Sequence, residues 1–135
     1  MTQLKLEKRH EWIQKTETFG VIVSCFEPVE GSWTWTMYAL IYDNHPLFTD
    51  VSAAVENLPW HCGCTYDKKF TIEPARGIRY DWQRKSEYYK IGCDYAHLYD
   101  DLIQSMSPEF GIPRQVMDDA KNLFDALLGY VEVQP

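Results

Sequence analysis

The chain has 135 residues, of which 13 are basic and 20 are acidic, giving a formal net charge of −7; 45% of its residues are hydrophobic. This length fits one globular domain, so we expect residues 1–135 to fold as a single unit. The composition excludes a largely disordered chain, and no apolar run approaches the roughly 20 residues of a membrane span. The acidic balance argues against nucleic acid as a partner, because binding to phosphate backbones needs a basic surface. The first ten residues lack an apolar signal core, so we expect a cytoplasmic protein that binds no membrane.

The first half of the chain is expected to consist mainly of strands. A short strand over residues 12–15, or the end of a helix that begins near Leu4, comes first. Residues 19–26 and 33–42 are rich in β-branched and aromatic side chains, and a turn-forming stretch separates them, so they predict a β-hairpin. Residues 48–58 carry apolar side chains at helical spacing and are followed by a proline, which predicts a short helix.

The second half is expected to end in helices. Residues 61–66 and 88–93 predict short strands, and the polar stretch 67–86 between them predicts a long loop with an edge strand. A helix is expected to begin at Asp94, and residues 113–128 predict an amphipathic helix that Gly129 caps and that serves as scaffold. Together these elements predict an α+β fold: a small, mainly antiparallel sheet with two to four packed helices, the last of them the C-terminal amphipathic helix.

The four cysteines are not expected to form disulfides, because a chain without an export signal belongs to a reducing compartment. Cys62 and Cys64 form a C-x-C pattern, which differs from the C-x-x-C of structural zinc sites. With His61 and Cys93 these cysteines could still hold zinc, but free cysteines buried on strands are the more common arrangement.

Three short segments carry the side chains best suited to chemistry: residues 43–47, 61–66 and 92–101. Each lies where a regular element ends, so that rigid backbone can direct a polar side chain into a cleft. Asp94, His97 and Asp100 recur every three residues, and on a helix such steps turn the side-chain direction by only about 60°. One imidazole with two carboxylates suits zinc, manganese or iron, and His61 would supply a fourth ligand from a neighbouring strand.

The same residues have two further interpretations. In the first, a carboxylate fixes the tautomer of His97 for proton transfer. In the second, the residues are structural: Asp94 caps a helix, His97 packs with one hydrogen bond, and Asp100 is a surface charge.

Short motifs in these segments also occur together in one protein family. The matching residues here are His45, Pro46 and Leu47; His61, Gly63, Thr65 and Tyr66; and Gly92, Asp94, Ala96, His97 and Asp100. With them the chain resembles a set of small, mostly uncharacterised phage and prophage proteins, whose motifs read His-Pro-Leu, His-Gly-Gly-x-Thr-Tyr and Gly-Phe-Asp-x-Ala-His-x-x-Asp. The match covers about residues 33–101 and departs at Cys62 and Cys93, where the family has glycine and an aromatic residue. These departures speak against cysteine as a ligand or nucleophile.

The resemblance implies that four residues form one site and that four others support it, and it brings no established reaction. The site residues are His61, Asp94, His97 and Asp100, and the supporting residues are His45, Gly63, Thr65 and Tyr66.

Two functions remain open from the sequence. The first is a phage-encoded accessory protein of the host cytoplasm, with a His/Asp site for a nucleotide-like small molecule or a divalent metal; whether it is an enzyme is left open. The alternative is a non-enzymatic protein with an anti-defence role, which binds and inhibits a host or defence protein through an acidic surface rich in aromatic residues. No P-loop, dinucleotide fingerprint, nucleophile elbow or H-E-x-x-H motif occurs in the sequence, which argues against the enzyme classes that carry them.

Overall fold

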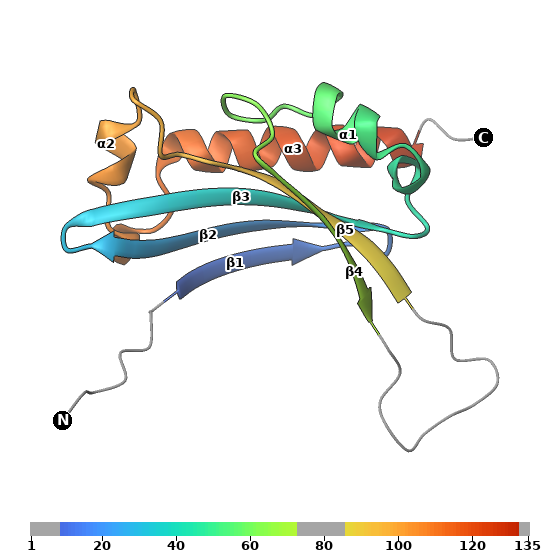
Figure 1. Cartoon of the computed structure of the whole chain (residues 1–135), viewed down its shortest axis with the longest axis horizontal. Helices are drawn as coiled ribbons and strands as arrows, with labels where there is room; N and C mark the ends of the chain where they lie inside the picture. The colour runs from blue at the N-terminus through green and yellow to red at the C-terminus, as the bar shows by residue number, and fades with distance from the viewer. Residues whose placement is uncertain (1–8, 73–85, 133–135) are drawn as a thin grey trace, which may run out of the picture.

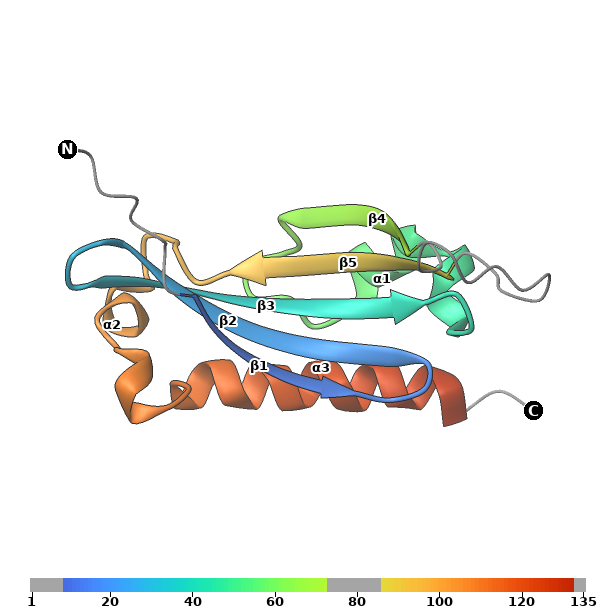
Figure 2. The ribbon, with the colours of Figure 1, turned by 90° about the horizontal axis from the view of Figure 1, so that it is seen from below.

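Five antiparallel strands form one sheet in the order β1-β2-β3-β5-β4, and helices cover one of its faces (Figures 1 and 2). The computed structural model describes residues 9–72 and 86–132. Its strands are β1 (Arg9–Lys15), β2 (Phe19–Val29), β3 (Ser32–Tyr42), β4 (Tyr66–Ile72) and β5 (Ser86–Asp94). Its helices are α1 (Val51–Asn57), α2 (Asp101–Gln104) and α3 (Arg114–Glu132), with 3-10 turns η1 (Pro46–Thr49) and η2 (Pro108–Phe110). The predicted α+β fold with a C-terminal helix is therefore confirmed.

The core lies between the sheet and helix α3. Side chains alternate across a strand, so every second residue of β2 and β3 faces the helix, beginning with Phe19 and Trp35. The apolar stripe of α3 meets them with four buried side chains, which are Val116, Ala120, Leu123 and Leu127. These contacts bury one face of the sheet and hold α3 along it (Figure 2).

Three element boundaries differ from the expectations. Strand β1 begins at Arg9, whereas the alternative helix near Leu4 lies outside the described residues. The segment expected as one helix divides into η1 and α1, with Asp50 between them accepting a hydrogen bond from the Ala53 backbone at 3.2 Å. Helix α3 continues through Gly129 to Glu132, so Gly129 is not its cap. Of the polar loop, residues 73–85 also lie outside the described residues.

The prediction of a helix that begins at Asp94 is wrong, because residues 95–100 form turns and α2 begins only at Asp101. Two carboxylates accept hydrogen bonds from backbone N–H groups of this segment. Asp94 accepts from the Ala96 N–H at 3.1 Å, and Asp100 accepts from the His97 N–H at 2.9 Å. Such side-chain hydrogen bonds compete with helix formation. Residues 61–65 are likewise a turn and not a strand, and β4 starts after them at Tyr66.

Among the described residues, no helix is both long enough and apolar enough to cross a membrane.

Candidate functional site

The candidate site is formed by the turn before β4 and the turn after β5. These strands pair antiparallel, with Tyr66 opposite Gly92, so the start of β4 lies beside the end of β5. The Thr65 N–H donates to the Gly92 carbonyl at 2.9 Å and holds the first turn against the second strand. Two turns separated by about thirty residues in the sequence are thus brought together above the helix-covered face (Figure 1).

Asp100 joins the two imidazoles of the site. Its Oδ1 accepts from His61 Nε2 at 2.8 Å, and its Oδ2 accepts from His97 Nδ1 at 3.0 Å. The two histidine rings lie 5.6 Å apart, edge to face. Asp100 is 4% exposed, so its carboxylate is a buried link between the two rings and not the surface charge of the structural interpretation.

The charge on Asp100 is held in place by its neighbours. Burial alone would raise the pKa of this carboxyl, but the His97 backbone N–H and the two imidazoles outweigh burial and lower the pKa below its usual value. An ionised carboxylate only accepts hydrogen bonds, so the ring nitrogens facing it carry protons. In the neutral imidazoles, His61 Nδ1 and His97 Nε2 are then the nitrogens that carry a lone pair, the state in which imidazole binds a metal.

Tyr95 and Asp119 support the ring of His61. The phenol ring of Tyr95 is stacked on His61 with centroids 4.3 Å apart, and its hydroxyl donates to Asp119 of α3 at 2.6 Å. Tyr95 is fully buried, and burial together with the bond to Asp119 raises the pKa of its hydroxyl, which keeps it protonated as a donor. Gln115, also on α3, lies with Nε2 3.5 Å from His61 Nδ1. The first turns of α3 therefore contribute to the site, in contrast to the expected purely scaffolding role.

Cys62 is the third potential ligand beside the two histidines. One ligand atom from each of His61, Cys62 and His97 lies within 4.8 Å of the other two. Cys62 is exposed and has a φ of 56°, in the left-handed region, where an L side chain costs about 1–2 kcal/mol. Gly63 follows with a φ of 91°, a conformation that glycine adopts without strain. The tight turn places the Cys62 side chain next to the histidines.

Asp94 lies at the edge of the site. Its Oδ1 is 3.7 Å from His97 Nδ1, longer than a hydrogen bond, and its Oδ2 accepts from the Thr65 hydroxyl at 3.4 Å. Of the four expected site residues, His61, His97 and Asp100 are thus bonded together, whereas Asp94 adjoins them and ties Thr65 to the end of β5.

His45, expected to support the site, lies at the other end of α3. Its Nε2 donates to the Leu127 carbonyl at 3.0 Å, while Gln115 marks the site end of the same helix. Gln115 and Leu127 are twelve positions apart, which corresponds to about 18 Å at the α-helical rise. The structure does not bring His45 to the site.

Two other motif residues have structural positions in the sheet. Tyr66 packs edge to face on Tyr38 at 5.5 Å, on the sheet face opposite the helices. A Cβ on Gly92 would meet the Tyr38 ring at 2.2 Å, so only glycine fits there. These contacts explain the glycine and the tyrosine through packing.

The remaining cysteines are not grouped with the two histidines as potential metal ligands. All four are free thiols. Burial raises the pKa of Cys93 to about 12, so this thiol does not ionise at neutral pH. Cys64 donates to the Tyr66 carbonyl at 3.2 Å, and burial raises its pKa as well. Of the four cysteines, Cys62 is the one whose thiol is grouped with both histidines as a potential ligand.

Sequence reasoning missed three residues around the site, Tyr95, Gln115 and Asp119, and it argued against Cys62 as a ligand after considering it together with His61. Cys62 follows His61 directly in the chain, and its neighbour Gly63 indicates a tight turn, which was the available signal. Tyr95 and Asp119 carry no signal in the sequence, because only the packing of α3 brings them together.

The comparisons with known proteins give no further assignment, since no family model, curated protein or solved structure matches the chain.

Proposed function

We propose that the protein binds a transition-metal ion of the zinc class through His61, His97 and Cys62, with Asp100 as the outer carboxylate that holds both imidazoles. The observation that carries this proposal is the double hydrogen bond of Asp100, one oxygen to each ring. Histidines that bind metals usually donate their other ring N–H to a carboxylate or carbonyl, which fixes the tautomer and orients the ring. Here one buried carboxylate serves both rings.

The ligand set favours zinc over magnesium or calcium. Two imidazoles and a thiolate are borderline and soft ligands, whereas magnesium and calcium select oxygen. In a tetrahedral zinc site with bonds of 2.0–2.3 Å, ligand atoms lie roughly 3.3–3.8 Å apart. One ligand atom of each of the three residues already lies within 4.8 Å of the other two, so the residues are close enough to surround one ion after side-chain rotation.

Three protein ligands leave a fourth position on a tetrahedral ion. Zinc sites with an open position bind water or a polar atom of a small molecule, whereas structural sites are closed by four protein ligands. The exposure of Cys62 and the partial exposure of His97 support a fourth position that is open to solvent. The proposed site is therefore better suited to binding a small polar ligand, for which a nucleotide is the candidate, than to a purely structural role.

The setting we propose is the cytoplasm, where the exposed Cys62 stays a reduced thiol and is available to the ion. An accessory role for a phage, as the motif resemblance implies, is compatible with such a compartment.

Cobalt substitution tests the ligand set, because a thiolate bound to Co²⁺ gives a sulfur-to-metal charge-transfer band in the near ultraviolet. We expect this band when the wild-type chain is titrated with Co²⁺, and its displacement by Zn²⁺. Cys62→Ser should abolish the band. Cys64→Ser, two residues away in the same turn, is the matched control and should retain it, because Cys64 bonds to the Tyr66 carbonyl instead. No band in the wild type, or equal loss in both variants, would contradict the proposed ligand set.

A further inference from the structure

The two edges of the sheet differ in how they are protected from pairing with another strand. Strand β4 at one edge carries Asp67, Lys68 and Lys69 in succession, and charged residues, lysine above all, are a common protection of sheet edges. Strand β1 at the other edge has the uncharged run Trp12, Ile13 and Gln14 at its centre. It pairs with β2 over all seven residues without a bulge and contains no proline. Within the described residues, β1 is therefore the sheet edge suited to pairing.

The hydrogen-bonding direction of each β1 residue follows from the ladder. Thr16 donates to the Phe19 carbonyl at 2.7 Å, which continues the register of β1 with β2. Bonded pairs alternate in an antiparallel ladder, so Gln14 and Trp12 also bond to β2. The N–H and C=O groups of Glu11, Ile13 and Lys15 consequently point away from the sheet, toward the free edge.

The exposure of β1 agrees with an unoccupied edge. Six of its seven residues are exposed and Trp12 is half-buried. Ile13 is 50% exposed although it is a large aliphatic residue at the centre of the strand. A strand that paired with β1 would bond to these outward-facing backbone groups and would cover part of the Ile13 side chain.

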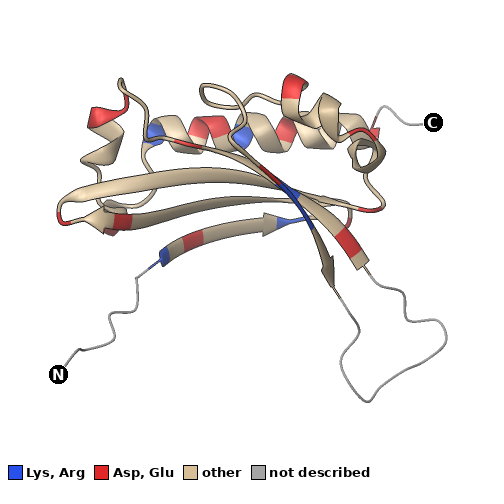
Figure 3. Cartoon of the chain, viewed as in Figure 1, with Lys and Arg blue, Asp and Glu red and all other residues tan. Residues whose placement is uncertain are grey.

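The charges of β1 select a second copy of the same strand as the occupant. In an antiparallel pair centred on Ile13, the backbone groups of Ile13 bond to those of its counterpart, and Glu11 of each copy faces Lys15 of the other. Both of these contacts bring opposite charges together. Centring the pair on Trp12 would set Arg9 opposite Lys15, and centring it on Glu11 would set two glutamates opposite each other, and like charges directly opposite are destabilising. Figure 3 shows that β1 carries charges of both signs.

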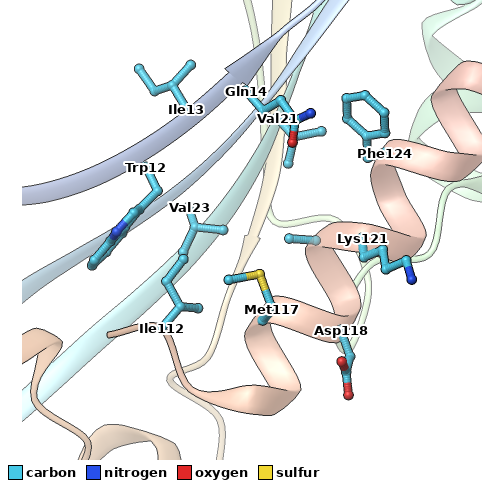
Figure 4. A pocket seen from close by; sticks show the side chains of 11 residues that line it. Trp12, Ile13, Gln14, Val21, Val23, Ile112, Met117, Asp118, Lys121 and Phe124 are labelled. Carbon is cyan, nitrogen blue, oxygen red and sulfur yellow. The ribbon is translucent and has the colours of Figure 1, made fainter. Parts of the chain in front are cut away.

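A groove runs beside this edge on the helix-covered side of the sheet (Figure 4). It has a volume of about 390 Å³, and its lining is mainly apolar, including Trp12, Val23, Ile112 and Phe124. Met117, 49% exposed, belongs to it as well. The twofold axis of an antiparallel strand pair is perpendicular to the sheet, so both copies would present their grooves on the same face, one on each side of the axis.

We infer that the protein forms a homodimer through antiparallel pairing of β1 with β1, in which Ile13 lies on the twofold axis and Glu11 of each copy contacts Lys15 of the other. The two sheets then form one continuous sheet of ten strands, five from each copy. This interface is separate from the metal site proposed above, which lies at the junction of β4 and β5.

A charge-swap experiment tests the inference and its register together. Sedimentation velocity over a range of concentrations should show a dimer for the wild type. Glu11→Lys alone gives two Lys–Lys contacts in its homodimer, and Lys15→Glu alone gives two Glu–Glu contacts, so each variant should dissociate at least tenfold more readily than the wild type. An equimolar mixture of the two variants restores both complementary contacts and should form a heterodimer of near wild-type stability. Lys68→Glu, on the opposite edge, is the control and should leave the dimer unchanged.

Because the mixture recovers dimerisation from two impaired variants, misfolding cannot imitate the expected result. A monomeric wild type at all concentrations would overturn the inference. A dimer that neither single variant weakens, or one that the mixture fails to restore, would overturn it equally.

Discussion

His45 and the pair His61–His97 lie at opposite ends of α3 and differ in what satisfies their ring nitrogens. His45 is 3% exposed, and both of its nitrogens bond to backbone: Nδ1 accepts from the Leu47 N–H at 3.1 Å, and Nε2 donates to the Leu127 carbonyl. His61 and His97 each bond to a carboxylate through one nitrogen, which leaves the other nitrogen as an acceptor or ligand.

The difference shows how a structural histidine can be distinguished from a candidate ligand. His45 caps η1 and joins it to the end of α3, so its imidazole has no remaining capacity for a ligand. Asp100, in contrast, orients two rings while consuming only one nitrogen of each. A histidine with one ring nitrogen bonded to a carboxylate can therefore still bind a ligand through its other ring nitrogen.

The largest expected effect on stability is at His45. We expect His45→Ala to lower the free energy of unfolding by about 2–4 kcal/mol, because it leaves the buried Leu47 N–H without its partner, removes the hydrogen bond to the Leu127 carbonyl and opens a cavity beside Phe19. His97→Ala, at a part-exposed ring, should cost about 0.5–1.5 kcal/mol, the range of one hydrogen bond. Urea unfolding of both variants measures the difference, and equal losses would remove the distinction between the two histidine environments.

The same residue is expected to cause a smaller loss of stability when the pH is lowered. Burial lowers the pKa of His45 below the ordinary value of 6.5, despite the opposing hydrogen bond to the Leu127 carbonyl, and the rings of Phe19 and Tyr130 lie against it. The unfolded chain then takes up a proton before the folded chain does. The stability that neutral His45 confers is complete above pH 6.5 and is lost as the pH falls through the lowered pKa.

The control for this prediction is His45→Ala, which retains every other titrating group. Urea unfolding between pH 7.5 and pH 5 should therefore show a steeper loss of stability for the wild type than for the variant. Identical slopes would show that His45 does not titrate differently in the folded and unfolded chains.

The sequence was most informative where a local pattern determines the structure. The β-branched and aromatic residues of 19–26 and 33–42, with the turn-forming stretch between them, predicted the hairpin, and the stripe of α3 predicted a buried helix face. The grouping of His61, His97 and Asp100 followed from motif resemblance, although the helix expected to align them does not form. The sequence could not separate His45 from the other two histidines, because its acceptor, the Leu127 carbonyl, lies 82 residues away in the chain. Nor could it pair Tyr95 with Asp119, which only the docking of α3 brings into contact.

If Asp100 prepares two imidazoles to bind one metal ion, its replacement should weaken zinc binding, and zinc titration calorimetry of Asp100→Asn measures this. An asparagine side chain accepts through one oxygen only, so it cannot orient both rings in the same tautomers. We predict one high-affinity zinc per wild-type chain and a 10- to 100-fold weaker affinity, about 1.4–2.7 kcal/mol, for a variant that circular dichroism shows to be folded. The same titration of His45→Ala should give the wild-type affinity. Equal zinc affinity in the wild type and Asp100→Asn, or no zinc binding by the wild type, would show that Asp100 does not prepare a zinc site.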